Sequence, residues 1–369
     1  MKKIAFLVLI AASTFTLIQS CSKSGNSTPD KNNGSSFDRG AMLTNISTNI
    51  ILPGYTAYQA DAVTLDAAVT TFNTTPNAIN LTAAQNAFIA TYKAWQSVSM
   101  YEFGPAAAIQ LQVNTNTFPA SVDVINANIT SGTYNPALLS NLPAKGLPAL
   151  DYLLFGTGAD NTAILAQYTT DSQAAHRKTY LATLTTEVKT NATTVLNQWT
   201  ASYKTTFASN TGTDAGSSTS LLVNQLIYDY ENLKNYEIGV PAGVQTSGQA
   251  LPAKVQAYYS KISLALAKLH LQAVQNLYMG ASGQGLDDYL VFVKAQYNGG
   301  SLNDAITAQF ATSLAKLNGL TDPLSANIIS NQAAVTATYT ELQKLTVLLK
   351  TDMTSSLGIL ITFGDNDGD

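Results

Sequence analysis

Two histidines, His176 and His270, are the only imidazole groups with which this chain could bind zinc or move a proton near neutral pH. Neither lies in an H-E-x-x-H pattern, and neither is followed by a carboxylate three or four residues further on. His270 lies between Leu269 and Leu271 on an apolar stretch, which favours a histidine packed in a helical core over a metal ligand. The sequence also lacks a Gly-x-Ser-x-Gly turn after a strand. It therefore predicts neither a zinc peptidase nor a serine hydrolase of the common kinds.

Hydrophobic periodicity predicts that helices position these groups. Ile262, Leu266, Leu269, Ala273 and Leu277 recur at spacings of three and four residues, which places them on one helix face. Glycine and proline separate similar segments, and strand alternation with hairpin turns is nearly absent. The sequence predicts an all-α fold with helices at residues 41–73, 81–103, 120–131, 171–208, 217–237, 252–279, 285–297, 302–317 and 331–357.

A short internal repeat connects two of these helices. Residues 101–106, Tyr-Glu-Phe-Gly-Pro-Ala, reappear with one inserted residue at 236–242, and each copy is expected to end a helix. The match indicates either two duplicated helical units or the chance recurrence of a common helix stop.

The N-terminus predicts export and lipid attachment. Lys2 and Lys3 precede an apolar run of about 15 residues, which is shorter than the roughly 20 residues that cross a bilayer and is typical of a signal peptide. Cys21, the only cysteine, follows this run and suits lipidation. We expect a signal peptide at residues 1–20 and a flexible tether at 21–37; the alternative is an ordinary secretory signal with an unpaired thiol.

The composition limits the partners of the chain. Its net charge is −4 and only 11% of its residues are charged, which predicts a neutral, polar surface and no nucleic-acid partner. We expect a protein of the cell envelope that is bound to a membrane through Cys21, on the periplasmic face or at the outer membrane surface.

Several segments together resemble the imelysin-like family. They include Ile-Leu-Pro-Gly-Tyr at 51–55, Lys-Gly at 145–146 with Asp-Tyr-Leu-Leu-Phe-Gly at 151–156, Tyr-Glu-Asn-Leu-Lys at 230–234 and Gly-Leu-Asp-Asp-Tyr-Leu at 285–290. The resemblance implies two helical bundles related by a pseudo-twofold, here residues 38–165 and 166–369, with a functional site in the cleft between them. Founding members of this family were described as insulin-cleaving peptidases, and others belong to iron-uptake systems.

The family signature Gly-x-His-x-x-Glu is altered in this chain. The segment begins at Gly146, but Pro148 occupies the histidine position and the shorter Asp151 occupies the glutamate position, followed by Tyr152. Proline provides neither a metal ligand nor a titratable group, so the altered motif does not predict a hydrolytic role. If a metal binds here, Asp151 is the best single candidate ligand.

The resemblance also places other side chains around the cleft. These candidates are Glu102, Glu231, Tyr236 and Glu237, with Asp229 as a further carboxylate, and oxygen-rich clusters suit hard cations such as ferric iron. Glu231 has a second interpretation, because Lys234 is one helical turn away and the two can pair on a solvated face.

Together with the export signal, the resemblance implies a non-enzymatic binding lipoprotein connected with iron uptake, with an iron species or an iron-bearing ligand in the cleft and other iron-uptake components as partners. The alternatives are a peptidase of the imelysin type and a surface adaptor that binds a protein or a glycan through its polar, tyrosine-rich face. A metal titration and a protease assay distinguish them.

Overall fold

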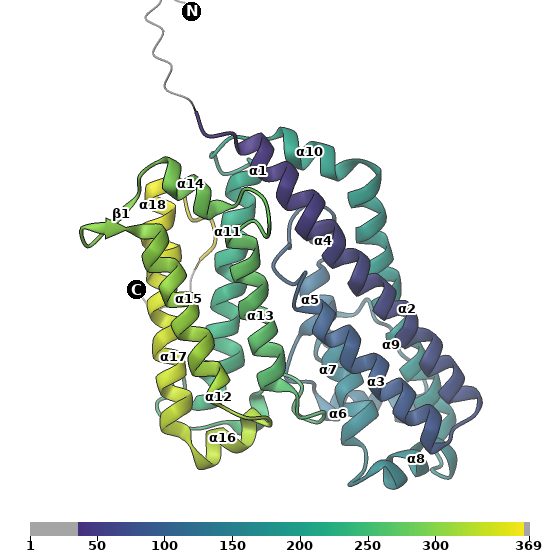
Figure 1. Cartoon of the computed structure of the whole chain (residues 1–369). Coiled ribbons are helices and arrows are strands. Elements are labelled where there is room, and N and C mark those ends of the chain that lie inside the picture. Colours follow the sequence, from purple (N-terminus) through teal and green to yellow (C-terminus); the bar gives the residue numbers. More distant parts are fainter. Residues whose placement is uncertain (1–35, 365–369) are drawn as a thin grey trace, which may run out of the picture. The chain divides into compact units, whose positions relative to one another are not determined.

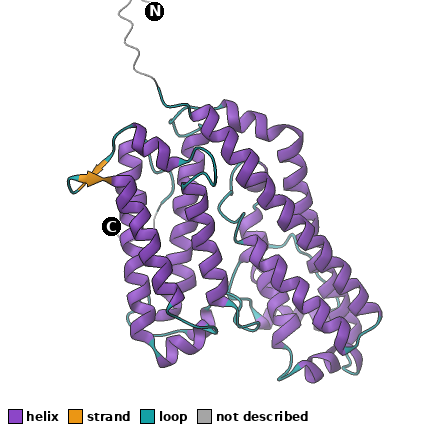
Figure 2. Ribbon diagram, in the orientation of Figure 1, coloured by secondary structure: helices purple, strands orange, loops and turns teal. Residues whose placement is uncertain are grey.

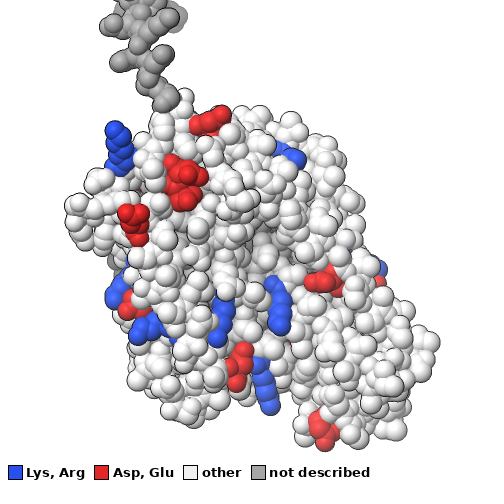
Figure 3. Space-filling model, in the orientation of Figure 1, with Lys and Arg blue, Asp and Glu red and all other residues white. Residues whose placement is uncertain are grey.

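The computed structural model describes residues 36–364, and helices make up almost all of its regular structure (Figure 2). The all-α class that periodicity predicts is therefore confirmed. The expected signal peptide, Cys21 and nearly all of the expected tether lie outside the described residues. Charged side chains are sparse on the face drawn in Figure 3, in keeping with the low charge of the sequence.

The first half of the chain packs around two long helices, α2 and α9. In order, its helices are α1 (Arg39–Ile46), α2 (Leu52–Thr74), α3 (Ala78–Trp95), α4 (Pro105–Ala108), α5 (Leu111–Asn116), α6 (Val122–Ser131), α7 (Gly146–Asp151), α8 (Asn161–Thr169), α9 (Ala174–Gln198) and α10 (Lys204–Ser209). Helix α2 packs along both α3 and α9, and the large buried side chains Tyr58, Trp95 and Trp199 lie in this core.

The second half contains the remaining helices and one short hairpin (Figure 1). In order, its elements are α11 (Ser218–Asn232), α12 (Val240–Ala242), α13 (Ser263–Tyr278), α14 (Leu286–Phe292), β1 (Gln296–Tyr297), β2 (Gly300–Ser301), α15 (Leu302–Asn318), α16 (Leu324–Ser330), α17 (Gln332–Val347) and α18 (Thr354–Leu357). Helix α15 packs along α17 and also contacts α13. The buried face of α13 includes Leu266 and Leu277 of the predicted stripe, whereas Leu269 and Ala273 are only partly buried.

Several helices continue into wider, π-helical turns. These turns are Ser47–Ile51, Tyr152–Gly156, Trp199–Tyr203, Leu233–Gly239 and Leu348–Met353. Such turns are rare and are found frequently at functional sites. Leu233–Gly239 follows α11 directly and carries two of the candidate site residues, Tyr236 and Glu237.

Three of the predicted helices are wrong in their extent. The helix expected at 81–103 begins at Ala78, where the Asn77 side chain caps it, and ends at Trp95. The helix expected at 252–279 begins only at Ser263, because the backbone before it turns through positive φ angles at Ala257 and Lys261. The helix expected at 285–297 stops at Phe292 and is followed by the missed hairpin β1–β2, whose turn is Asn-Gly at 298–299.

The two copies of the internal repeat differ in backbone conformation. The first copy follows the end of α3, and its Gly104 has a φ of +52° just before α4. The second copy is helical and includes Gly239, which has a φ of −68°. The expectation that each copy ends a helix is therefore wrong for the first copy.

The expected division between residues 165 and 166 falls within α8, and α9 is the next helix. This helix packs along α2, and α7 and α8 also contact it. The long helix that opens the expected second bundle therefore packs with helices of the first.

Candidate functional site

A pocket of about 180 Å³ lies between residues 96–118 on one side and α11, the turn Leu233–Gly239 and α13 on the other. It is lined by Gln96, Ser99, Gln112, Val113, Asn116, Thr117, Phe118, Asp229, Asn232, Tyr236, Glu237 and His270. Its charged members Asp229, Glu237 and His270 are at most 5% exposed, whereas Val113 and Tyr236 are each 42% exposed. The pocket therefore has a charged floor and an exposed rim.

The floor is built by two adjacent segments of helix. Asp229 is buried on α11, and Glu237 follows it about two turns later in the turn Leu233–Gly239. His270 projects from the buried face of α13. The start of α13 is fixed by the Asp322 carboxylate, which accepts hydrogen bonds from Leu264 N and Ala265 N.

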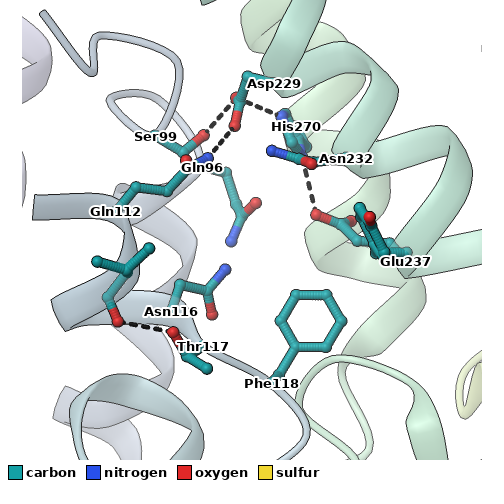
Figure 4. Close-up of a pocket in the computed structure, with 12 residues that line it drawn as sticks. Gln96, Ser99, Gln112, Asn116, Thr117, Phe118, Asp229, Asn232, Glu237 and His270 are labelled. Carbon is teal, nitrogen blue, oxygen red and sulfur yellow. Dashed lines mark hydrogen bonds and ion pairs between the residues drawn. The ribbon is translucent and has the colours of Figure 1, made fainter. Parts of the chain in front are cut away.

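His270 joins the two carboxylates (Figure 4). Its Nε2 lies 2.7 Å from Asp229 Oδ2 and its Nδ1 lies 2.9 Å from Glu237 Oε1. Burial alone lowers the pKa of His270, but the charges of Asp229 and Glu237 and the hydrogen bonds to them outweigh it and raise the pKa to about 10. At neutral pH the ring is therefore an imidazolium that donates both N–H groups, with one carboxylate on each side.

Three hydrogen-bond donors contact the carboxylate oxygens of Asp229. Ser99 Oγ donates to Oδ2 at 2.8 Å, where His270 Nε2 also binds, and Gln112 Nε2 donates to Oδ1 at 2.9 Å. Gln112 N in turn donates to Glu102 Oε2 at 3.0 Å. Burial raises the pKa of Glu102, and the nearby charge of Asp229 raises it further, against the opposing hydrogen bond from Gln112.

The two carboxylate oxygens of Glu237 differ in their hydrogen bonding. Its Oε1 binds His270, but its Oε2 is buried and has no hydrogen-bond partner among the described residues. Phe118 lies below Glu237 in the view of Figure 4, and Tyr236 is the neighbouring residue at the rim. Because buried polar atoms are nearly always paired, this oxygen is the least satisfied polar group of the site.

The altered family signature lies at a second pocket of about 250 Å³, whose lining includes Pro148, Asp151 and Phe118. Gly146 is required at the start of α7, because its φ is +66° and a Cβ there would lie 2.2 Å from Thr115 O. Pro148 is buried in the first turn of α7, where a missing N–H leaves no helical bond unmade.

Asp151 fixes a loop through hydrogen bonds and does not offer an open coordination position to a metal ion. Its two carboxylate oxygens accept hydrogen bonds from Tyr259 N and Ser260 N, each at 2.9 Å. Burial raises the pKa of Asp151 to about 6, against the hydrogen bonds from Ser260 and Tyr259. Tyr152 is half-buried and packs edge-on against Tyr259, at 5.2 Å between ring centroids.

The structure separates the predicted site residues into three places. Tyr236 and Glu237 line the first pocket, with Glu102 bonded to its wall through Gln112. Pro148 and Asp151 line the second pocket, Tyr152 packs against Tyr259 of its lining, and Gly146 begins the helix that carries them, α7. Glu231 belongs to neither, because its Oε1 binds Lys350 Nζ at 2.9 Å in a largely buried ion pair.

Sequence reasoning predicted the carboxylates Asp229 and Glu237 of the first pocket but missed the histidine that joins them. His270 is buried, as its apolar neighbours indicate, but both of its nitrogens bind carboxylates. Ser99 and Gln112 carry no local pattern that distinguishes them from other polar residues. The available signal was the pair Asp229 and Glu237, which lie about two turns apart on one predicted helix.

The described residues do not present a preformed metal site. Within residues 36–364, no three His, Cys, Asp or Glu side chains are arranged to hold one ion. In the same part of the chain, no helix is both long and apolar enough to cross a bilayer.

The fold and the site define an all-helical protein with an imidazolium held between two carboxylates on the floor of a pocket. The family model described as imelysin matches residues 51–351, which is most of the chain. The chain therefore belongs to the imelysin family, as its sequence segments indicate.

Known proteins agree with this assignment. Iron-regulated protein A of Synechococcus elongatus is 21% identical over 296 residues, which cover 78% of this chain and 77% of that protein. An imelysin-like protein from Psychrobacter arcticum has a TM-score of 0.68 at 20% identity, with 88% of this chain and 97% of that chain covered. An iron-regulated protein A precursor from Parabacteroides distasonis has a TM-score of 0.72 at 16% identity, with 86% and 95% covered. These structures share the fold of this chain.

Proposed function

We propose that this chain is a non-enzymatic binding protein of the cell envelope that takes part in iron uptake and holds its ligand in the pocket above Asp229, His270 and Glu237. The observation that carries the proposal is Glu237 Oε2, a buried carboxylate oxygen without a hydrogen-bond partner in the described part of the chain. Leaving such an atom unpaired costs about 1–3 kcal/mol, and more when it is charged. A ligand that donates a hydrogen bond to it removes that cost, so the pocket is more stable when occupied.

The connection with iron is supported by relatives. Two similar proteins, from Synechococcus elongatus and Parabacteroides distasonis, are described as iron-regulated protein A or its precursor. We extend this connection to the present chain as part of the proposal.

The arrangement at His270 favours binding over peptide hydrolysis. A histidine that acts as a general base needs a free ring nitrogen, but both nitrogens of His270 donate to carboxylates. Ser99 donates to Asp229 rather than to the imidazole, so it lacks the base that activates a nucleophilic serine. These contacts support the proposal that the charge network positions a ligand.

The same contacts indicate the form in which iron enters. The hydrogen bonds to both oxygens of Asp229 and to Oε1 of Glu237 leave Oε2 of Glu237 as the carboxylate oxygen on the floor without a partner among the described residues. A bare ion needs at least four ligands. The residues therefore do not fit a naked iron ion, and we propose that iron arrives as a complex with an organic molecule.

Attachment at Cys21 is the envelope part of the proposal. A Cys21→Ala protein should move from the membrane fraction to the soluble fraction, because it lacks the thiol that carries the lipid. If the variant stays with membranes after a salt wash, the anchor assignment is wrong.

Calorimetric titration of the purified protein with a ferric hydroxamate complex that carries a free ammonium group, with ferrous sulfate and with zinc chloride tests the binding function. We expect heat from an iron complex and none from zinc. Chelator-sensitive cleavage of insulin would contradict the proposal in favour of a peptidase. Binding of a protein or a glycan, with no response to any iron species, would favour the adaptor alternative.

A further inference from the structure

We propose that the first pocket recognises an organic cation of the ammonium or guanidinium class, with its N–H group bound by Glu237 and its hydrocarbon part against Phe118. This inference rests on the proposed binding function and names the chemistry of the ligand. An iron complex would then be held through a positively charged group of its organic part.

The charge of the pocket supports a cation. Asp229 and Glu237 contribute two carboxylates against the one imidazolium of His270, and the Glu102 carboxyl lies next to them behind Gln112. Neither lysine nor arginine is among the described residues that line this pocket. An anion entering it would meet uncompensated negative charge, whereas a cation would neutralise it.

The number of open acceptors distinguishes an organic cation from a metal ion. Glu237 Oε2 is buried and unpaired in the described structure, while Glu237 Oε1 and both oxygens of Asp229 already accept hydrogen bonds. One open carboxylate oxygen satisfies one N–H donor of an ammonium group. The amide side chains of Gln96 and Asn232, which also line the pocket, offer neutral acceptors for further N–H groups.

The rest of the wall suits a hydrocarbon part. Phe118, Val113 and Tyr236 line the pocket, and an aromatic ring attracts a nearby organic cation through its face. A volume of about 180 Å³ is far more than one ion or one water molecule needs. Since Oε2 is closed to solvent, binding must include a rotation of the Glu237 carboxyl group toward the pocket.

Three probes that share one ring test this inference. Benzylammonium, benzyl alcohol and benzoate carry a positive, a neutral and a negative group, and each is titrated calorimetrically into the full-length protein at low and high salt. We expect benzylammonium to bind at least about tenfold more tightly than benzyl alcohol, with an affinity that decreases as salt increases, and we expect benzoate not to bind.

Two variants assign the binding to this pocket. Glu237→Gln should weaken benzylammonium binding by about 10- to 100-fold, because a hydrogen bond to a charged acceptor is lost. Glu341→Gln removes the same charge from α17, outside the pocket lining, and should leave the affinity unchanged. If Glu237→Gln does not fold, Phe118→Leu provides a second test and should weaken binding by about two- to fivefold.

The outcomes separate this inference from the proposed function. If benzylammonium binds no better than benzyl alcohol, or equally well to Glu237→Gln, the inference is wrong. If the protein then still binds an iron species, the proposed function survives without it. If benzylammonium binds as expected but no iron complex does, the cation site stands and the connection with iron fails.

Discussion

Replacing His270 with glutamine tests the charge network at the floor of the pocket. Glutamine keeps a hydrogen-bond donor but removes the positive charge between Asp229 and Glu237, which leaves two buried carboxylates without a counter-charge. Removing one partner of a buried charge pair typically costs about 3–5 kcal/mol. We therefore expect His270→Gln to lower the free energy of unfolding at pH 7 by about that amount.

The pH dependence of the free energy of unfolding provides a second expected magnitude for the comparison of wild type with His270→Gln. The pKa of His270 is raised from 6.5 to about 10, so its stabilisation is complete below pH 6.5 and is lost as pH rises through about 10. A tenfold change in proton affinity corresponds to about 1.4 kcal/mol. The difference between wild type and His270→Gln should therefore decrease by up to about 5 kcal/mol between pH 6.5 and 10.

Urea unfolding measures this difference directly. The buried Trp95 and Trp199 report unfolding by fluorescence, and the titration is repeated at several pH values from 6 to 10. His176→Gln is the matched control, because His176 is exposed and should change stability little. If the wild type and His270→Gln differ by the same amount at every pH, His270 is not a buried imidazolium and the reasoning fails.

Two further predictions concern the altered signature. Gly146→Ala should destabilise the protein by at least about 2 kcal/mol more than Gly358→Ala. Both glycines have positive φ, but a Cβ at Gly146 would meet backbone atoms, whereas no described atom lies within 4 Å of a Cβ at Gly358. Equal shifts of the melting temperature would refute this steric argument. The Asp151→Asn variant should lack the part of the pH dependence of its unfolding free energy that the Asp151 carboxyl group contributes in wild type. Since the pKa of Asp151 is raised to about 6 from 3.8, wild type should lose about 3 kcal/mol relative to the variant as pH rises from about 4 to 6, and parallel urea-stability curves would contradict this.

Local sequence patterns account for the helices but not for their interruptions. The periodicity of α13 predicts its helix but places the buried face only in part, because Leu266 and Leu277 are buried whereas Leu269 and Ala273 are only partly buried. The non-helical backbone before Ser263 depends instead on Asp151, which binds the N–H groups of Tyr259 and Ser260 from 108 and 109 residues away. No window of the sequence contains both partners, so periodicity alone extends the helix too far.

The site was harder to predict for the same reason. The neighbours of His270 in sequence are apolar and indicate a core residue, while its bonded partners Asp229 and Glu237 are 41 and 33 residues earlier. The family signature predicted Asp151 as a candidate ligand, but in this chain Asp151 binds the backbone of a loop. Glu237 was predicted through the resemblance, but its unpaired oxygen is visible only in the structure.

Nitrogen-edited NMR of the histidine rings tests the central claim most directly, because the chain contains only His176 and His270. We predict that the His270 ring shows imidazolium nitrogen shifts from pH 6 to about pH 9, and that these shifts move on addition of benzylammonium in wild type but not in Glu237→Gln. A His270 ring that loses its proton near pH 6.5 would contradict the charge network. A ring that does not respond to the cation in wild type would contradict the role of the network in binding.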